Sequence, residues 1–158
     1  MTKLAINGGT LVRTEPYPSW PLYDEGEKEA LIAVLESRKW TSAPYVDDLP
    51  ATELEEQFAA YNDAEYGIAT SSGTAALQIA FAAAGVREGD EVIVPPNTFI
   101  AGVTPILFLG AVPVFVDVEP EYLTLDPEAV EAAITDRTKA ISPLHLAGTR
   151  RCTRRPDV

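Results

Sequence analysis

Four consecutive residues, Ser71-Ser72-Gly73-Thr74, have the composition of a phosphate-binding turn. A glycine lets the backbone approach an anion closely, and the N–H groups that open a following helix point towards that anion. The hydroxyl groups of Ser72 and Thr74 add side-chain donors. Ser-Gly-Thr is also common as a helix N-cap, so these residues alone predict either a phosphate cradle or a cap.

An aromatic residue, Phe99, ends the run PPNTF and begins a second helical stretch. Its ring is placed to cover one face of a planar ligand, and the alternative is a place in the hydrophobic core. Asp117 and His145, the single histidine, follow two further strand-like runs. Each is a candidate for a functional role at a bound ligand. The alternatives are an aspartate that caps a loop and a histidine that is packed in the structure.

Several catalytic signatures are missing from the sequence. It contains no Walker pattern, no GxGxxG fingerprint and no GxSxG serine-hydrolase elbow. One histidine and one cysteine, Cys152, do not form a metal-binding cluster, so we expect no metal site. A single cysteine also rules out an intramolecular disulfide and favours a reducing compartment.

The elements that must position these residues alternate from residue 66 onward. The patterns predict strands over 66–70, 91–94, 112–116 and 140–146, separated by helices over 74–84 and 98–109 and a helix capped by Asp126 with Pro127 at its first position. Such alternation predicts a three-layer α/β/α fold with a mainly parallel sheet. Ligands bind beyond the carboxyl ends of such strands, where the candidate residues fall.

The preceding part of the chain has a different character. Residues 1–23 are rich in proline and glycine and predict an extended arm, whose aromatic anchors are Tyr17, Trp20 and Tyr23. Asp24 predicts the cap of a helix that fades near Ser37, residues 40–51 predict a loop, and a capping-box pattern at Thr52 and Glu55 predicts a second helix through Tyr61. We expect three segments: the arm 1–23, a domain over 24–148, and an arginine-rich end over 149–158.

Composition limits the class of protein. The 158 residues are 46% hydrophobic and 23% charged, which is typical of one soluble globular domain. There is no secretory signal and no apolar run of about 18 residues, so we expect a cytoplasmic protein that does not act at a membrane. The net charge of −12 argues against nucleic acid as a partner. The last ten residues, TRRCTRRPDV, form either a basic tail or sequence foreign to the fold.

Taken together, the order and spacing of these motifs resemble the N-terminal half of the DegT/DnrJ/StrS family of pyridoxal-phosphate (PLP)-dependent sugar aminotransferases. The resemblance runs from about residue 4 to Gly148 and is carried by FAAYNDAEYGIATSSGTAALQIAFAAAGVREGDEVIVPPNTFIAG and GAVPVFVDVEPEYLTLDPEAVEAAITDRTKAISPLHLAG. The opening GGTLVRTEPYPSWPLYDEGEKEAL resembles members that act on keto-cyclitols or make aminohydroxybenzoate.

The resemblance implies the large domain of a fold-type-I transferase, here incomplete, and a homodimer with its sites at the subunit interface. It also implies transfer of an amino group from glutamate or glutamine to a keto-cyclitol or a nucleotide-linked keto-sugar, in sugar, antibiotic or polysaccharide biosynthesis. Ser72, Gly73 and Thr74 match the family's phosphate-binding turn, and Phe99 matches the aromatic residue that stacks on the pyridine ring. His145 matches a Pro-x-His pattern to which we assign no role.

Two departures from the family pattern bear on activity. Ala43 stands where a glycine is usual, in a loop that is a few residues longer. The family's second half, which carries the Schiff-base lysine and the acidic partner of the pyridinium nitrogen, has no counterpart here. Nothing positions the lysines of this chain against a cofactor: they are Lys3, Lys28, Lys39 and Lys139. We therefore expect an N-terminal fragment that alone does not transaminate and whose end after Gly148 is aberrant, as after a frameshift.

Three hypotheses remain open on the residues. The chain is a fragment of an aminotransferase, or a non-catalytic α/β module that holds PLP or another phosphorylated metabolite, or an interaction protein whose acidic body and arginine-rich end engage a partner.

Overall fold

The centre of the fold is the short strand β1 (Glu91–Val94). In the computed structural model, which describes residues 3–40 and 49–148, β1 lies between β2 (Val112–Phe115) and β3 (Thr138–Ile141), and both pairings are parallel. All four residues of β1 are buried. A continuous apolar run bounded by turn residues is typical of such a central strand, and the expected bounds of β1 are confirmed.

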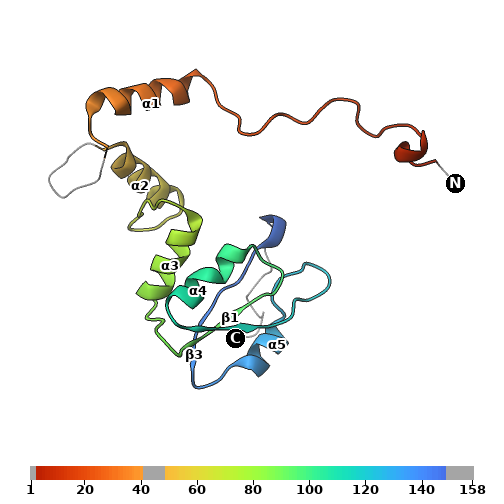
Figure 1. The fold of residues 1–158 in the computed structure, drawn as a ribbon, viewed down its shortest axis with the longest axis vertical. Coiled ribbons are helices and arrows are strands. Elements are labelled where there is room, and N and C mark those ends of the chain that lie inside the picture. Colours follow the sequence, from red (N-terminus) through yellow and green to blue (C-terminus); the bar gives the residue numbers. More distant parts are fainter. Residues whose placement is uncertain (1–2, 41–48, 149–158) are drawn as a thin grey trace. The chain divides into compact units, whose positions relative to one another are not determined.

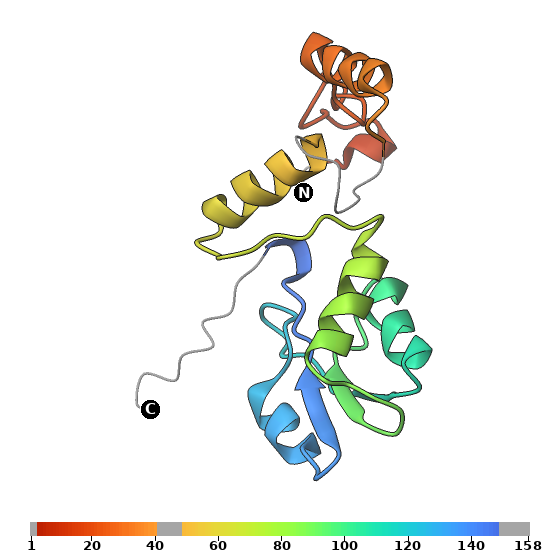
Figure 2. The ribbon, with the colours of Figure 1, turned by 90° about the vertical axis from the view of Figure 1, so that its left-hand side faces the viewer.

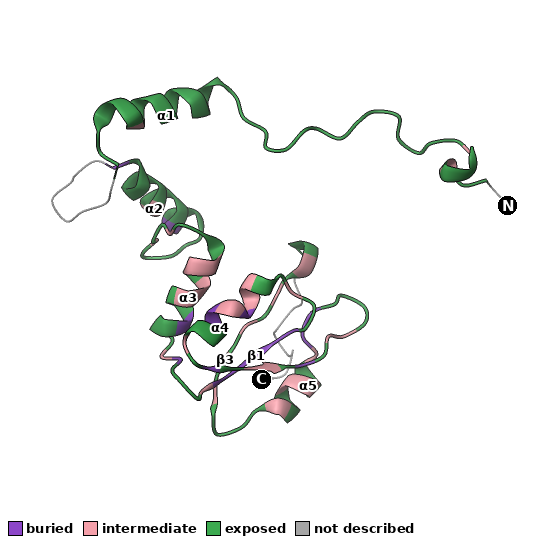
Figure 3. Ribbon diagram, in the orientation of Figure 1, coloured by how far each residue is buried: buried purple, intermediate pink, exposed green. Residues whose placement is uncertain are grey.

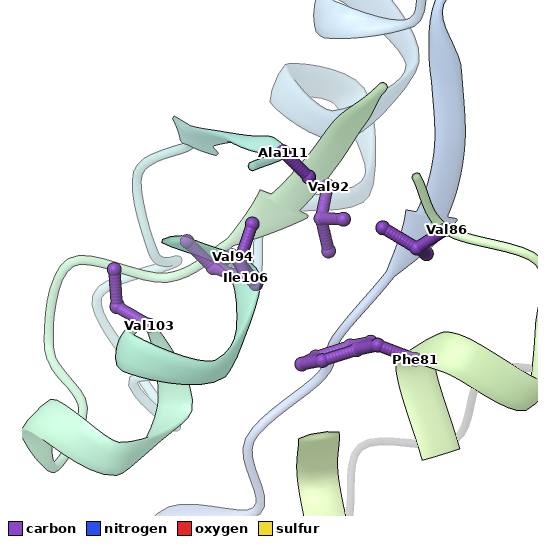
Figure 4. Close-up of a cluster of buried hydrophobic side chains, with 7 residues drawn as sticks. All are labelled: Phe81, Val86, Val92, Val94, Val103, Ile106 and Ala111. Carbon is purple, nitrogen blue, oxygen red and sulfur yellow. The ribbon is translucent and has the colours of Figure 1, made fainter. Parts of the chain in front are cut away.

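Helices cover both faces of this sheet. The side chains of Val92 and Val94 pack with Phe81 of α3 (Gly73–Ala83) and Ile106 of α4 (Thr104–Phe108), as the close-up shows (Figure 4). On the other face, Ile93 packs against α5 (Pro127–Ala133). The two ribbon views show α5 on the opposite side of the strands from α3 and α4 (Figures 1 and 2). The expected α/β fold with three layers and a parallel sheet is confirmed.

The chain divides into two compact units, Met1–Ala69 and Thr70–Val158, and the sheet belongs to the second. The described residues of the first unit contain a 3-10 turn (Ala5–Asn7) and the helices α1 (Glu25–Ser37) and α2 (Pro50–Tyr61). Asp24 caps α1 as expected, through a reciprocal capping box with Glu27. The aromatic residues of the arm, Tyr17, Trp20 and Tyr23, are exposed. Figure 3 shows burial concentrated around β1 and sparse along α1 and α2.

Two expectations for the segment around α2 are wrong. The helix begins at Pro50, so Thr52 lies within its first turn and does not cap it, because a proline fits the first helical position without losing a hydrogen bond. Glu55 instead accepts a hydrogen bond from the Ala69 N–H at 2.7 Å. The expected strand over 66–70 does not form: Gly67 lies against α2, where a Cβ atom would come 2.5 Å from the Glu55 carbonyl oxygen.

Two further boundaries differ from expectation because of proline. The expected helix over 98–109 is interrupted at Val103, between a 3-10 turn (Ile100–Gly102) and α4, since the ring of Pro105 clashes with the carbonyl group four residues before it in a continuous helix. The fourth expected strand, 140–146, is observed as β3 and ends before Pro143, which has no N–H to donate. The last pairing bond runs from the Ser142 N–H to the Ile93 carbonyl, 2.8 Å.

Some expectations lie outside the described residues. These are most of the loop over 40–51, with Ala43, and the arginine-rich end over 149–158, with Cys152. Among residues 3–40 and 49–148, no helix has the length and apolar character needed to cross a bilayer. The same described residues contain no group of three or more histidine, cysteine, aspartate or glutamate side chains arranged to hold a metal ion.

A buried carboxylate joins the amino end of β1 to the turn before β3. The Glu91 side chain accepts a hydrogen bond from the Thr135 hydroxyl at 2.6 Å and forms an ion pair with Arg137. The Glu91 side chain is only 7% exposed, so its charge depends on these two partners. This contact holds β3 beside β1 at the end of the sheet opposite to the strands' carboxyl ends.

We predict that Arg137→Met lowers the free energy of unfolding by about 1–3 kcal/mol, because it leaves a buried carboxylate with one side-chain donor. Arg87→Met is the matched control: Arg87 lies on the exposed loop before β1, and a change within about 0.5 kcal/mol is expected there. Denaturant unfolding followed by circular dichroism measures both. Equal losses in the two variants would contradict a specific role for the Glu91–Arg137 pair.

The loop between β2 and α5 is organised by another carboxylate. Glu119 accepts hydrogen bonds from the N–H groups of Glu121 and Tyr122, both at 2.9 Å, and from the Thr124 hydroxyl at 3.4 Å. Desolvation acts to raise the pKa of Glu119, but these hydrogen bonds outweigh it and lower the pKa below its ordinary value of 4.5. The ionised form of Glu119 therefore stabilises the folded loop.

We predict that the Glu119 contribution to stability is fully present above pH 4.5 and is lost as the pH falls through the lower pKa of the folded state. The Tyr122 amide resonance, followed by NMR during acid titration, reports the protonation of its acceptor. Its midpoint should lie below 4.5 in the wild type, move up in Thr124→Val, and disappear in Glu119→Gln. A wild-type midpoint at or above 4.5 would refute the assignment.

Candidate functional site

The first turn of α3 presents backbone donors with no acceptor of their own. Ser72 is the N-cap, and its hydroxyl accepts from the Ala75 N–H at 3.1 Å. Among the described residues, no acceptor is found for the N–H groups of Gly73 and Thr74 or for the Thr74 hydroxyl. These groups, at the positive end of an 11-residue helix, form an arrangement that attracts an anion.

The fold of this chain does not itself require a glycine at position 73. Its φ angle is outside the left-handed region, and a Cβ atom built there meets no atom within 4 Å. Elsewhere the chain uses glycine for a structural reason, as at Gly110, where φ is +70°. A Cβ at position 73 would occupy open space at the start of α3, where a ligand held by the N–H groups would lie.

A cavity of about 440 Å³ opens beside this turn. One wall is the start of α3, with Gly73, Thr74 and Leu77. The other two walls are the segments that follow β1 and β3, and they contribute Val94, Pro95, Thr98, Phe99, Ala101, Gly102, Ser142, Pro143 and Leu144. The cavity therefore lies at the carboxyl ends of β1 and β3, as expected for a parallel sheet. Among the described residues, its lining is mostly apolar and has no charged side chain, so hydroxyl and backbone groups supply its polarity.

Phe99 lines the cavity and leaves most of its surface in solvent. It is 78% exposed although it is one of the largest apolar side chains in the unit, so the core interpretation of Phe99 is wrong. Extended backbone at Phe99 begins the 3-10 turn that leads to Gly102. A Cβ on Gly102 would come 2.7 Å from the Thr98 hydroxyl oxygen, so this glycine lets Thr98 pack closely behind Phe99. An exposed ring on a fixed turn is suited to cover a planar ligand.

Other sequence candidates are not part of this cavity. The Ser72 hydroxyl is used as the helix cap, and Ser72 is absent from the lining. Asp117 is exposed and accepts a hydrogen bond from the Val118 N–H at 2.8 Å, which fits the loop-capping alternative. His145 is exposed and does not line the cavity, and its carbonyl oxygen accepts from the Gly148 N–H at 3.0 Å.

No lysine lines the cavity. Lys139 lies at the opposite end of the sheet, where its side chain passes over Gly85, which precedes β1. Lys28 forms an ion pair with Glu25 at 2.7 Å on α1. The residues around the cavity can thus bind and orient a phosphorylated planar molecule, and none of their side chains is an amine.

One lining residue, Ser142, was not singled out from the sequence. The sequence pattern placed it inside a strand, where serine carries little information. The available signal was the following Pro143, which ends the strand and leaves a polar residue at its carboxyl end, the part of the sheet where ligands bind.

Comparison with known proteins decides the family. The family model of the DegT/DnrJ/EryC1/StrS aminotransferase family matches residues 21–151. This chain belongs to that family. The resemblance predicted from the motifs is confirmed, and the fold is that of the fold-type-I aminotransferases.

By name, the similar proteins include an aminotransferase for an inosose and a synthase of an amino-hydroxybenzoic acid. The chain is 48% identical, over 145 residues, to an L-glutamine:2-deoxy-scyllo-inosose aminotransferase of Streptomyces lividus, an alignment that covers 90% of this chain and 34% of that protein. The crystal structure of 3-amino-5-hydroxybenzoic acid (AHBA) synthase is 43% identical with a TM-score of 0.79, covering 84% of this chain and 34% of the other.

A second similar structure contains a cofactor. The structure of NtdA from Bacillus subtilis with bound cofactor PMP is 41% identical with a TM-score of 0.70, covering 79% of this chain and 28% of that one. This chain therefore spans about a third of the length of the relatives it matches.

We predict that Gly73→Ala does not lower the free energy of unfolding, because the new methyl group meets open space and alanine favours helix. Gly110→Ala, in the same unit, is the matched control and should cost about 1–2 kcal/mol, because alanine there must keep a positive φ. Urea unfolding measures both variants. A destabilised Gly73→Ala protein would show that the glycine serves the fold, and would remove the argument for a ligand at that position.

Proposed function

We propose that this chain is the cofactor-holding part of a PLP-dependent aminotransferase that transfers the amino group of L-glutamine to a keto-cyclitol. The main support for this proposal is that Gly73, Thr74 and Phe99 line one cavity, at the carboxyl ends of β1 and β3. The names of the similar proteins support glutamine as donor and a keto-cyclitol as acceptor. A keto-sugar acceptor and glutamate as donor are the alternatives within the same family.

The residues present fit PLP. The phosphate is held by the N–H groups of Gly73 and Thr74 and by the Thr74 hydroxyl, which have no other acceptor among the described residues. Ser72 contributes by capping α3 and so fixing these donors. Phe99 covers one face of the ring. Bound PLP supplies an electron sink that lets an amino group leave one carbon and join another.

The site of the complete enzyme needs groups that the cavity lining does not contain, above all a lysine. We propose that in the whole enzyme they come from the part of the family sequence that this chain does not span and from a second subunit of a homodimer, and that the enzyme works in the cytoplasm. The absence of an amine in the lining also favours a second candidate function, a non-catalytic module that holds PLP or another phosphorylated metabolite.

Equilibrium dialysis against PLP tests what both candidate functions require, the binding of PLP by this chain. We predict saturable binding of PLP that excess inorganic phosphate displaces, and binding about three- to tenfold weaker in Phe99→Ala because ring stacking is lost. Phe108→Ala is the matched control: Phe108 is an exposed phenylalanine on α4 that does not line the cavity, so binding should be unchanged. Absence of saturable binding, or equal weakening by the two substitutions, would contradict the proposal.

Borohydride reduction followed by peptide mapping then separates the two candidate functions. PLP covalently attached to one lysine after reduction supports catalysis by this chain. Saturable binding without attachment supports a holding role, with the lysine supplied elsewhere.

A further inference from the structure

The segment that follows β3 contributes one polar side chain to the cavity, that of Ser142. Side chains alternate between the two faces of an extended strand. Ala140, two residues earlier, packs against the core cluster between the sheet and α3 and α4. Ser142 continues the same pairing through the hydrogen bond from its N–H to the Ile93 carbonyl, so its side chain faces the same side, where the cavity lies.

The Ser142 hydroxyl is not used by the fold. Among the described residues it has no hydrogen-bond partner, and it is not a fully enclosed group. Its neighbours in the lining, Val94, Pro143 and Leu144, offer no side-chain donor or acceptor. A half-buried hydroxyl in an apolar wall costs free energy unless a ligand group pairs with it.

Ser142 belongs to a different segment from the groups proposed to bind the phosphate, so it would contact a different part of the ligand. Gly73 and Thr74 belong to the start of α3, whereas Thr98 follows β1 and Ser142 follows β3. The Thr98 hydroxyl donates to the Phe99 carbonyl at 3.3 Å, whereas the Ser142 hydroxyl has no partner among the described residues. A ligand whose phosphate is held at α3 has its ring in the apolar part of the cavity. Only a ring with a polar edge offers Ser142 a partner.

We propose that Ser142 is a specificity-determining residue that hydrogen-bonds a polar group on the edge of the ligand's ring, and so selects a substituted pyridine over a plain aromatic ring. The inference rests on the proposed function, because it takes the phosphate to lie at Gly73 and Thr74.

Calorimetric titration of the chain with two probes tests this role. PLP and benzyl phosphate both carry a phosphate on a one-carbon arm of a six-membered aromatic ring, but only PLP has polar groups on the ring edge. The wild type should bind PLP more tightly than benzyl phosphate. Ser142→Ala should weaken PLP binding about two- to tenfold and leave benzyl phosphate binding unchanged, and Ser142→Thr, which keeps the hydroxyl, should restore PLP binding.

The other outcomes are distinct. If the wild type binds PLP and Ser142→Ala binds it equally well, or if the substitution weakens both probes alike, the role of Ser142 is refuted and the proposed function stands. If the wild type binds neither probe, the proposed function and this inference both fail. Circular dichroism of each variant confirms that the comparison is made between folded proteins.

Discussion

Burial of β1 on both faces is the constraint on which the rest of this structure depends. Val92 and Val94 pack towards α3 and α4, and Ile93 packs towards α5, so three residues tie three layers together. Each fully buried valine or isoleucine contributes about 1.5–3 kcal/mol. The position of the carboxyl end of β1 is thereby fixed, and with it Pro95 and the turn that carries Phe99. The Ile93 carbonyl also receives the Ser142 N–H and so aligns the segment after β3 with the same cavity.

Several residues around the cavity are not explained by the fold. Gly73 meets neither a crowded neighbour nor a positive φ, Phe99 leaves a large apolar ring in solvent, and the hydroxyls of Thr74 and Ser142 have no partner among the described residues. Each is unfavourable or neutral for folding, and together they surround one space. Under the proposed function, a phosphorylated planar ligand would satisfy all of them at once, which agrees with membership of a PLP-dependent family.

The elements whose positions depend on neighbouring residues could be predicted from the sequence. Those that depend on pairing with distant segments could not. β1 is a continuous apolar run, and α1 and α5 have their own caps at Asp24 and Asp126, so their positions follow from neighbouring residues. The expected strand over 66–70 failed because a strand requires a partner, and this segment is held by the Glu55 side chain instead. Phe99 could be placed at the carboxyl edge of the sheet because it follows β1, whereas Gly73 and Thr74 reach the same cavity through the start of α3 and not through the strand expected before them. The direction of the Ser142 side chain could not be predicted, because it depends on how the segment after β3 pairs with β1.

The central claim is that a phosphorylated ring lies in the cavity between α3, β1 and β3. The most direct measurement is an amide NMR spectrum of the nitrogen-labelled chain during titration with PLP. The account predicts that the resonances of Gly73, Thr74 and Ala75 shift most, followed by those of Gly102 and Ser142, with one common dissociation constant. Shifts confined to other parts of the chain, or a spectrum unchanged by PLP, would contradict it.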